Sequence, residues 1–310
     1  MKILEIGFTG VPFFNKNVKK EAESRGHSVD FCSANSLNVD IGSDTIDIRA
    51  DEFDLQEYDV IHVGSLVQNR WPVIAALGYL KENGCVIVDD RLVSSMLDQY
   101  SGLAKYFTEE ENGINLPRSI VFKKVSQIED KIKEFKFPAI IKNNCSKQGL
   151  GVGLAKNIDD IKEFVNNGLK ADPKMGFILR EYIPNNGDYR VNVIDGVAVV
   201  CLKRTPKKGE YRSNISRGGT LTNANPDDVV EVCAVAEKIV QLANYDIAGV
   251  DVMVHKETGV PYVLEINRAP GSLEDDVEVS GVDIAGLIVD LYEKRHANNR
   301  YLKITEKVIS

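Results

Sequence analysis

The chain has 310 residues, a length that exceeds the usual size of one hydrophobic core. Of these residues 43% are hydrophobic and 27% are charged. This composition, without repeats or low-complexity tracts, excludes a disordered protein and favours an enzyme of two or three packed units. The formal net charge of −8 argues against a general polyanion binder, so no nucleic-acid partner is expected.

The N-terminal sequence MKILEIGFTG predicts a short strand rather than a signal peptide, and no apolar stretch approaches 18 residues. The five cysteines are scattered and form no CxxC pair, which favours reduced thiols over disulfides or zinc. The sequence therefore predicts a soluble, cytoplasmic protein without membrane contact.

The first ninety residues alternate apolar strand patterns with helical patterns. We predict strands over 2–8, 27–34, 58–65 and 85–90, and helices over 15–25 and 71–84. This rhythm is typical of a parallel sheet with covering helices. The first turn, GFTGVPFF, lacks the GxGxxG spacing, which argues against a dinucleotide site.

A smaller unit begins after a helical pattern over 91–116, which Gly113 and Pro117 end. We predict strands over 119–124, 137–142 and 176–183, and helices over 126–135 and 158–167. Hairpins follow, and Asp195-Gly196 is a type I′ turn signal. A last helix over 283–296 precedes a tail, 297–310, to which the sequence assigns no role.

The stretch NNCSKQGLGVGLA follows the strand FPAIIK and carries Gly149, Gly151 and Gly153 on alternate positions. Alternate glycines allow backbone N–H groups to approach an anion, and Lys142 just before the loop could contact phosphate oxygens. Turn glycines and a solvated strand-end lysine are the favoured explanation of the stretch taken alone, and the GxxxxGK[ST] spacing of a P-loop is missing. The stretch alone therefore does not identify a phosphate site.

The stretch GVDVMVHKETGVPYVLEIN reads as a hairpin with acids in both strands. Asp251 and Glu265 each lie seven residues from Thr258, so a turn centred there places the two carboxylates opposite each other. Asn267 then shares their face. Facing carboxylates repel and need a cation, and oxygen ligands without His or Cys suit Mg²⁺. The alternative is an edge hairpin with solvated acids.

The stretch KRTPKKGEYRSNISRGG concentrates six basic residues in an acidic chain, and its prolines and glycines predict a loop. Such a cluster could neutralise a phosphate, hold a carboxylate, or form an ordinary solvated surface loop.

Five motifs, in this order and spacing, resemble the ATP-grasp carboxylate–amine ligases, most closely the RimK type that adds glutamate to a carboxyl group. They are FPAIIKNNCSKQGLGVGLA, FILREYIPNNGDYRV, EYRSNISRGG, GVDVMV and YVLEINRAPG. The resemblance covers about 98–292. It implies an N-terminal parallel α/β domain over 1–97, a central ATP-grasp small domain over 98–185, and a C-terminal ATP-grasp domain with a short tail over 186–310.

The resemblance also implies roles for single residues. Those expected to bind the nucleotide are Lys142, Gly149 and Gly151 at the phosphates, Glu181, Tyr182 and Ile183 at the adenine, and Asp188 at the ribose. Arg204, Arg212 and Asn214 are expected to hold the acyl phosphate and its phosphate donor, and Arg217 is expected where the loop approaches the substrate or phosphate. The expected metal ligands are Asp251, Glu265 and Asn267, holding Mg²⁺ with Mn²⁺ as an alternative ion.

One position departs from the family pattern. Where the family has a lysine in a D-K pair, this chain has Asp98-Gln99, so either Lys105 replaces that lysine or the site has one lysine fewer.

The implied function is ATP-dependent formation of an amide or peptide bond through an acyl phosphate, with release of ADP and phosphate. The expected partners are a small-molecule or peptide carboxylate and an amino-acid amine, in a monomer or a homo-oligomer. The alternative is an ATP- and Mg²⁺-binding module without ligase activity.

Overall fold

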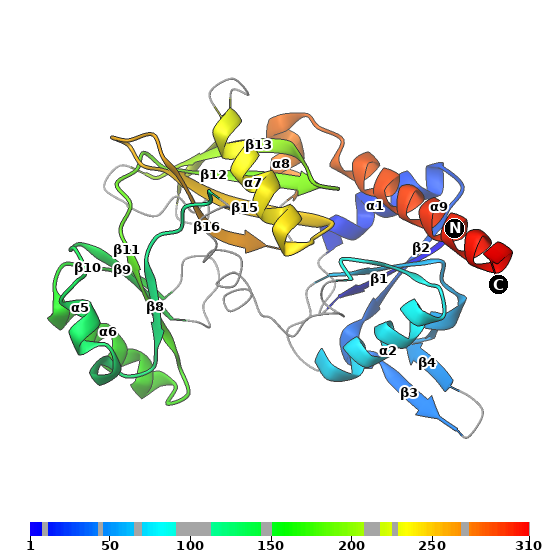
Figure 1. Cartoon of the computed structure of the whole chain (residues 1–310), viewed down its shortest axis with the longest axis horizontal. Coiled ribbons are helices and arrows are strands. Elements are labelled where there is room, and N and C mark those ends of the chain that lie inside the picture. Colours follow the sequence, from blue (N-terminus) through cyan, green and yellow to red (C-terminus); the bar gives the residue numbers. More distant parts are fainter. Residues whose placement is uncertain are drawn as a thin grey trace.

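The computed structural model describes residues 1–7, 12–42, 46–64, 70–90, 113–143, 151–207, 218–224, 229–267 and 273–309. Figure 1 shows three units: the N-terminal α/β unit at the right, a small sheet with its helices at the left, and a larger sheet above and between them. In this part of the chain no helix is long and apolar enough to cross a membrane.

The N-terminal unit is the predicted parallel sheet, with strand order β2-β1-β6-β7. Its elements are β1 (Lys2–Gly7), α1 (Pro12–Ser24), β2 (Ser28–Ser33), β6 (Val60–Val63), α2 (Arg70–Glu82) and β7 (Val86–Val88). The apolar runs of β6 and β7 are buried, as expected for strands covered on both faces.

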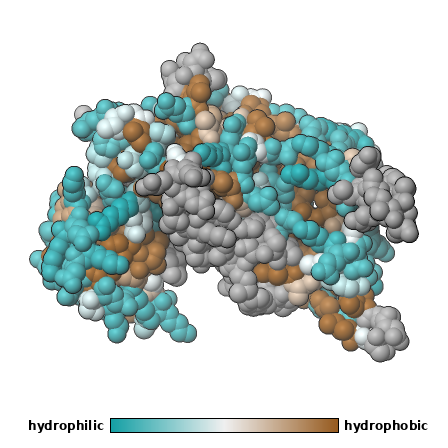
Figure 2. Space-filling model, viewed as in Figure 1, coloured by the Kyte–Doolittle hydropathy of each residue, from teal (hydrophilic) through white to brown (hydrophobic). Residues whose placement is uncertain are grey.

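This unit also contains a second, three-stranded sheet that the sequence patterns did not predict. It consists of β3 (Asn38–Ile41), β4 (Ile46–Ala50) and β5 (Phe53–Asp54), joined as antiparallel neighbours. The strands are short, and every residue of β3 is exposed, so they carry little apolar periodicity to detect. In Figure 2 hydrophobic surface gathers at this lower right end, where Ile41 is 73% exposed.

The small sheet is antiparallel, with order β10-β9-β11-β8. Its strands are β8 (Ser119–Phe122), β9 (Ala139–Asn143), β10 (Val152–Ala155) and β11 (Phe177–Glu181), and α5 (Glu129–Ile132) and α6 (Ile158–Ala171) cover one face. Helix α6 begins where the Asn157 side chain accepts hydrogen bonds from the N–H groups of Asp159 and Asp160. It buries Ile161 and Val165 against Phe177.

The helix predicted over 126–135 is shorter in the structure. A 3₁₀ turn at Val125–Gln127 precedes the four-residue α5. The Gln127 side chain accepts the N–H groups of Lys123 and Lys124, which favours a tight turn over a regular first helical turn. Of the helix predicted over 91–116, residues 91–112 lie outside the described residues, and residues 113–116 are not helical.

The large sheet is antiparallel, with order β14-β13-β12-β15-β16, and α7 packs on one face. Its elements are β12 (Asp188–Ile194), β13 (Val197–Thr205), β14 (Thr220–Asn223), α7 (Val230–Ala243), β15 (Ile247–Val254) and β16 (Pro261–Asn267). Asp195 and Gly196 join β12 to β13 with φ values of 51° and 80°, which confirms the predicted type I′ turn.

The C-terminal tail continues the last helix. After α8 (Leu273–Ser280), α9 runs over Ile284–Ile309 and lies across α1, as Figure 1 shows. The predicted end of this helix at residue 296 was therefore wrong, because no glycine or proline interrupts the polar stretch that follows.

Helix α9 shares one hydrophobic core with the N-terminal sheet. Ile284, Ile288 and Tyr292 pack in the same cluster as Ile3 and Val88. The predicted boundaries near residues 97 and 185 fall between the sheets, and as domain boundaries they stay predictions.

A buried polar network extends this contact. The Tyr292 hydroxyl donates to Glu5 Oε1 at 3.2 Å and lies 2.7 Å from His62 Nδ1, while His62 Nε2 lies 3.5 Å from Asp89 Oδ2. Burial alone would lower the pKa of His62, but hydrogen bonds to Asp89 and Glu5 raise it to about 9. His62 is therefore an imidazolium at neutral pH, which offsets the charge of the buried acids.

Candidate active site

The large sheet has one apolar and one polar face. On β15, Val250 and Val252 point into the core under α7, so Asp251 between them points to the other face. The cross-strand register places Arg190 of β12 opposite Asp251, and Asp188 opposite Arg204 of β13. Strand periodicity thus gathers charged side chains on one face of a sheet whose other face is core.

The register of β15 and β16 confirms that Asp251 faces Glu265. The predicted turn centre at Thr258 was nevertheless wrong, because Val252 pairs with Val263 on the turn side of the pair. The irregularity between Asp251 and Val252 leaves Leu264 as an extra, bulged residue that restores the facing of the carboxylates. Beyond the bulge Asn267 pairs with Gly249, so it lies on the same face as Glu265.

Two arginines neutralise Asp251. Arg190 Nε lies 2.7 Å from its Oδ1 and Arg204 Nη2 lies 2.8 Å from its Oδ2. Arg204 also contacts both carboxylate oxygens of Asp188, from Nε at 3.1 Å and from Nη2. Burial would raise the pKa of Asp251, but the two guanidiniums hold it below its usual value. Asp251 is therefore a carboxylate at neutral pH.

The predicted metal ligands form a set of two carboxylates and one amide. Within the described residues, no group of three His, Cys, Asp or Glu side chains could hold a metal ion. Glu265 makes no ion pair with the described residues, whereas Asp251 makes two. Asp251 Oδ1 is buried without a hydrogen-bond partner, its contact with Arg190 being an ion pair only. This oxygen set fits a hard divalent cation that takes one or two protein carboxylates.

Lys142 approaches this face from the small sheet. It is the fourth residue of β9 and pairs with Ile178 of β11. Burial and the charge of Arg180 lower its pKa to about 8, while Glu265 and Asp251 act in the opposite direction. Lys142, Arg180 and the facing carboxylates therefore belong to one electrostatic cluster between the two sheets.

The predicted adenine-binding segment connects the sheets. Glu181 ends β11, and its N–H donates to Arg118 O at 2.8 Å. Tyr182 is half-buried and Ile183 is buried, and the carbonyl of Ile183 accepts a hydrogen bond from the Asn185 side chain at 2.7 Å. The chain then turns through Gly187 into β12, so Asp188 lies at the start of the strand that carries Arg190.

The glycines after β9 have different roles. Gly151 has a φ of 70°, which favours glycine, and its carbonyl accepts the Asn143 N–H at 3.1 Å, one pair beyond the Lys142–Val152 pair of β9 and β10. A Cβ on Gly153 would lie 3.1 Å from Phe164 and 3.2 Å from Ile141. Gly153 is therefore small because helix α6 packs against it, which supports the structural explanation at that position.

Several predicted residues lie outside the described part of the chain: Gly149, Arg212, Asn214 and Arg217, together with Gln99 and Lys105. The structure brings together Lys142, Asp188, Arg204, Asp251, Glu265 and Asn267. The sequence analysis missed Arg190 and Arg180. For Arg190 a signal existed, because the alternation in DYRVN places it on the face of Asp188.

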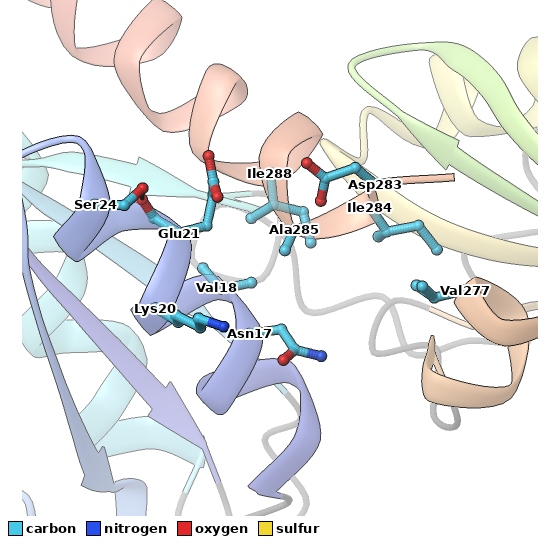
Figure 3. Close-up of a pocket in the computed structure, with 10 residues that line it drawn as sticks. All are labelled: Asn17, Val18, Lys20, Glu21, Ser24, Val277, Asp283, Ile284, Ala285 and Ile288. Atoms are coloured by element: carbon cyan, nitrogen blue, oxygen red, sulfur yellow. Dashed lines mark hydrogen bonds between the residues drawn. The ribbon is translucent and has the colours of Figure 1, made fainter. Parts of the chain in front are cut away.

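A separate cavity of about 280 Å³ lies between α1 and the α8–α9 segment. Figure 3 shows Lys20 and Glu21 of α1 on one side and Asp283 and Ile288 on the other. None of its lining residues comes from the strands that carry the charged face.

Comparisons with known proteins bear on the family and the fold of the chain. The model of the RimK-like ATP-grasp domain matches residues 104–292. A protein of Psychromonas ingrahamii named probable alpha-L-glutamate ligase is 30% identical over 309 residues, with 95% of both chains covered.

Solved structures show the same fold. The ATP-grasp ligase PsnB complexed with a minimal precursor has a TM-score of 0.67 at 17% identity, covering 94% of this chain and 98% of PsnB. D-alanine–D-alanine ligase from Bacillus anthracis, complexed with ATP, has a TM-score of 0.64 at 15% identity, covering 97% and 99%. A family match over more than half of the residues, with a relative 30% identical along nearly the whole length, shows that the chain is a C–N bond-forming ligase of the RimK-like ATP-grasp family.

Proposed function

We propose that this ligase joins a carboxylate to the amine of an amino acid through an acyl phosphate, with ATP as phosphate donor and ADP and phosphate as products. The observation that carries the proposal is the facing pair Asp251 and Glu265, opposed by Lys142 from the neighbouring sheet, in a chain of this family. A carboxylate is a poor acylating agent because oxide is a poor leaving group, so its oxygen must first be phosphorylated.

In this proposal Asp251, Glu265 and Asn267 would hold Mg²⁺, which when bound neutralises charge on the transferring phosphoryl group. Lys142 holds the nucleotide phosphates, and the segment from Glu181 to Ile183 holds the adenine, with Asp188 at the ribose. Gly149 and Gly151 belong to the loop that covers the phosphates. Placing the acid, the phosphate and the amine in contact supplies most of the rate enhancement, and no protein nucleophile is needed.

The basic residues would act on the acid substrate. Arg204 orients the acyl phosphate, together with Arg212, Asn214 and Arg217 of the following loop. Because Arg204 is bound to Asp188 and Asp251 before substrates enter, it is held in place on the polar face rather than recruited from solvent. Such fixed donors stabilise developing charge without reorganisation.

Glutamate is the first candidate for the amine, since the relative from Psychromonas ingrahamii is named a glutamate ligase. A peptide is a candidate for the carboxylate as well as a small acid, since PsnB was solved with a precursor peptide. We also propose a cytoplasmic location, which the absence of disulfides at Cys32, Cys201 and Cys233 in the described structure supports.

The test is a panel of acids and amino acids incubated with the protein, ATP and Mg²⁺, with products identified by mass spectrometry. We expect a condensed product and an equal amount of ADP. Release of AMP would contradict the acyl-phosphate route, and ATP binding without any stimulated turnover would favour a binding module.

A matched pair of variants on one hairpin tests the metal site. Glu265→Gln removes a facing carboxylate that makes no ion pair in the described structure, and we expect turnover to fall by roughly 100-fold or more. Glu257→Gln makes the same substitution in the exposed turn and should leave turnover unchanged. Equal activity of the two variants would contradict the metal assignment.

A further inference from the structure

Arg180 is a half-buried cation on the face of the small sheet that carries Lys142. The register pairs Ile178 with Lys142 and Arg180 with Ile140, so Arg180 and Lys142 are diagonal neighbours on one face of β9 and β11. Side chains in this relation are within reach of each other when they are long. Glu181, the predicted start of the adenine segment, directly follows Arg180.

The Arg180 guanidinium lies where the two sheets meet. Its Nη1 donates to the carbonyl of Leu264 at 3.0 Å, and its Nε donates to Ser119 Oγ at 3.0 Å. Leu264 is the bulged residue that immediately precedes Glu265. A backbone carbonyl of the large sheet thus accepts from a side chain of the small sheet, and this contact holds the guanidinium beside the strand that carries Glu265.

Two cations held close together on one face repel each other. The charge of Arg180 disfavours the ammonium form of Lys142, while the carboxylates of Glu265 and Asp251 act against this effect. A ligand with several negative charges would relieve the repulsion between the two cations. The planar guanidinium also offers donors in a fork that matches phosphate oxygens, which a lysine does not.

We propose that Arg180 binds the phosphates of the nucleotide together with Lys142, an inference that rests on the proposed function. Arg180 would then bind phosphate from the small sheet while it stays anchored to Leu264 of the large one. It would also supply a positive charge to a chain that has Gln99 where the family resemblance expects lysine.

The test measures the dissociation constants of ADP and AMP, each with Mg²⁺, by titration calorimetry. We expect Arg180→Gln to weaken ADP binding by roughly 10- to 100-fold and AMP binding by clearly less, because AMP carries one phosphate group. Arg180→Lys keeps the charge and should stay much closer to the unaltered protein than Arg180→Gln does.

Arg118→Gln is the matched control. Arg118 lies before β8, forms an ion pair with Glu134 and stacks on Phe135 at 4.9 Å, so this variant should bind ADP normally. Unchanged ADP binding by Arg180→Gln would overturn the inference. Equal losses for ADP and AMP in both Arg180 variants would also overturn it and leave only a sheet-to-sheet anchor. Failure of the unaltered protein to bind ADP would instead overturn the proposed function.

Discussion

Asp251 and Glu265 face each other as two negative charges, but they differ in their ion pairs. Asp251 receives two guanidiniums, from Arg190 and Arg204, whereas Glu265 makes no ion pair to the described residues. The pair therefore carries less net repulsion than two bare carboxylates would. It still presents carboxylate oxygens to an entering cation, because each carboxylate offers about four acceptor sites.

The cation that compensates Asp251 could be predicted only in part from the hairpin sequence. The like-charge argument predicts a compensating cation for the facing pair, and the residues of the hairpin alone suggest only a metal. Arg190 supplies part of that charge from the neighbouring strand β12, 61 positions before Asp251 in the chain. Which strands become neighbours depends on topology, so this partner could not be read from the motif itself.

Lys142 gives a pH-dependent prediction at this scale. Its pKa of about 8 lies below the ordinary lysine value because of burial and the Arg180 charge, so about half of the ammonium is lost at pH 8 in the free protein. Nucleotide phosphates favour the charged form, so binding must take up protons. We expect an uptake of up to about half a proton per ADP at pH 8, little uptake at pH 6, and weaker binding as pH rises above 8.

Calorimetry in two buffers with different ionisation enthalpies measures this uptake. Lys142→Arg is the control, because a guanidinium stays charged throughout this range and contributes no proton. The same uptake in Lys142→Arg and in the unaltered protein would show that another group titrates.

The β15–β16 hairpin shows how an element positions side chains that periodicity alone misplaces. Strict alternation puts Val263 and Glu265 on one face, yet Val263 is buried under α7 and Glu265 faces Asp251. The bulge at Leu264 reverses the alternation, so Val263 can point into the core while Glu265 points to the polar face. The facing pair was predictable from the sequence, whereas the bulge was not, because no glycine or proline marks it.

Element prediction succeeded for several elements with long apolar periodicity and failed for short ones, but it also missed α7, although that helix buries Val232, Val235 and Ile239. The strands of the parallel sheet and helix α6 have buried apolar faces of several residues, and all were found. The exposed β3 and the 3₁₀ turn before α5 have few buried residues, so side-chain hydrogen bonds and local turns determine them instead.

Gly187 gives a prediction at the entry to β12. Its φ is 109°, and a Cβ there would lie 2.2 Å from the carbonyl oxygen of Arg204. Gly187→Ala must therefore displace β13 or Asp188, and we expect a loss of about 3 kcal/mol or more in unfolding free energy, with weaker nucleotide binding. Gly196→Ala, with a φ of 80° and its nearest neighbour at 3.5 Å, should cost about 1 kcal/mol. Urea denaturation compares the two, and similar losses would contradict the proposed clash.

At the scale of the whole molecule, the two ends of the chain fold as one unit. Helix α9 covers the N-terminal sheet with Ile284, Ile288 and Tyr292, and the Tyr292 hydroxyl joins the buried network of Glu5 and His62. A fragment ending at the predicted boundary of residue 97 would lack these side chains. The strands of the N-terminal sheet come from one continuous segment, but part of the core beneath them comes from the C-terminal helix.

Substitution of Tyr292 tests whether the N-terminal unit depends on α9. The reporter is the fluorescence of Trp71, the single tryptophan, which lies in α2 of the N-terminal unit. Tyr292→Ala removes a fully buried ring, a change that costs about 3–5 kcal/mol, and we expect the thermal transition of Trp71 fluorescence to fall by roughly 5–15 °C. Tyr292→Phe keeps the ring and removes only the hydroxyl bonds, so its shift should be smaller, for a cost of about 1–3 kcal/mol. If Trp71 reported an unchanged transition in Tyr292→Ala while circular dichroism showed a lower one, the N-terminal unit would be stable without α9. Coincident, lowered transitions would instead mean that the large sheet and the N-terminal sheet unfold together, because α9 packs in a core that both sheets share.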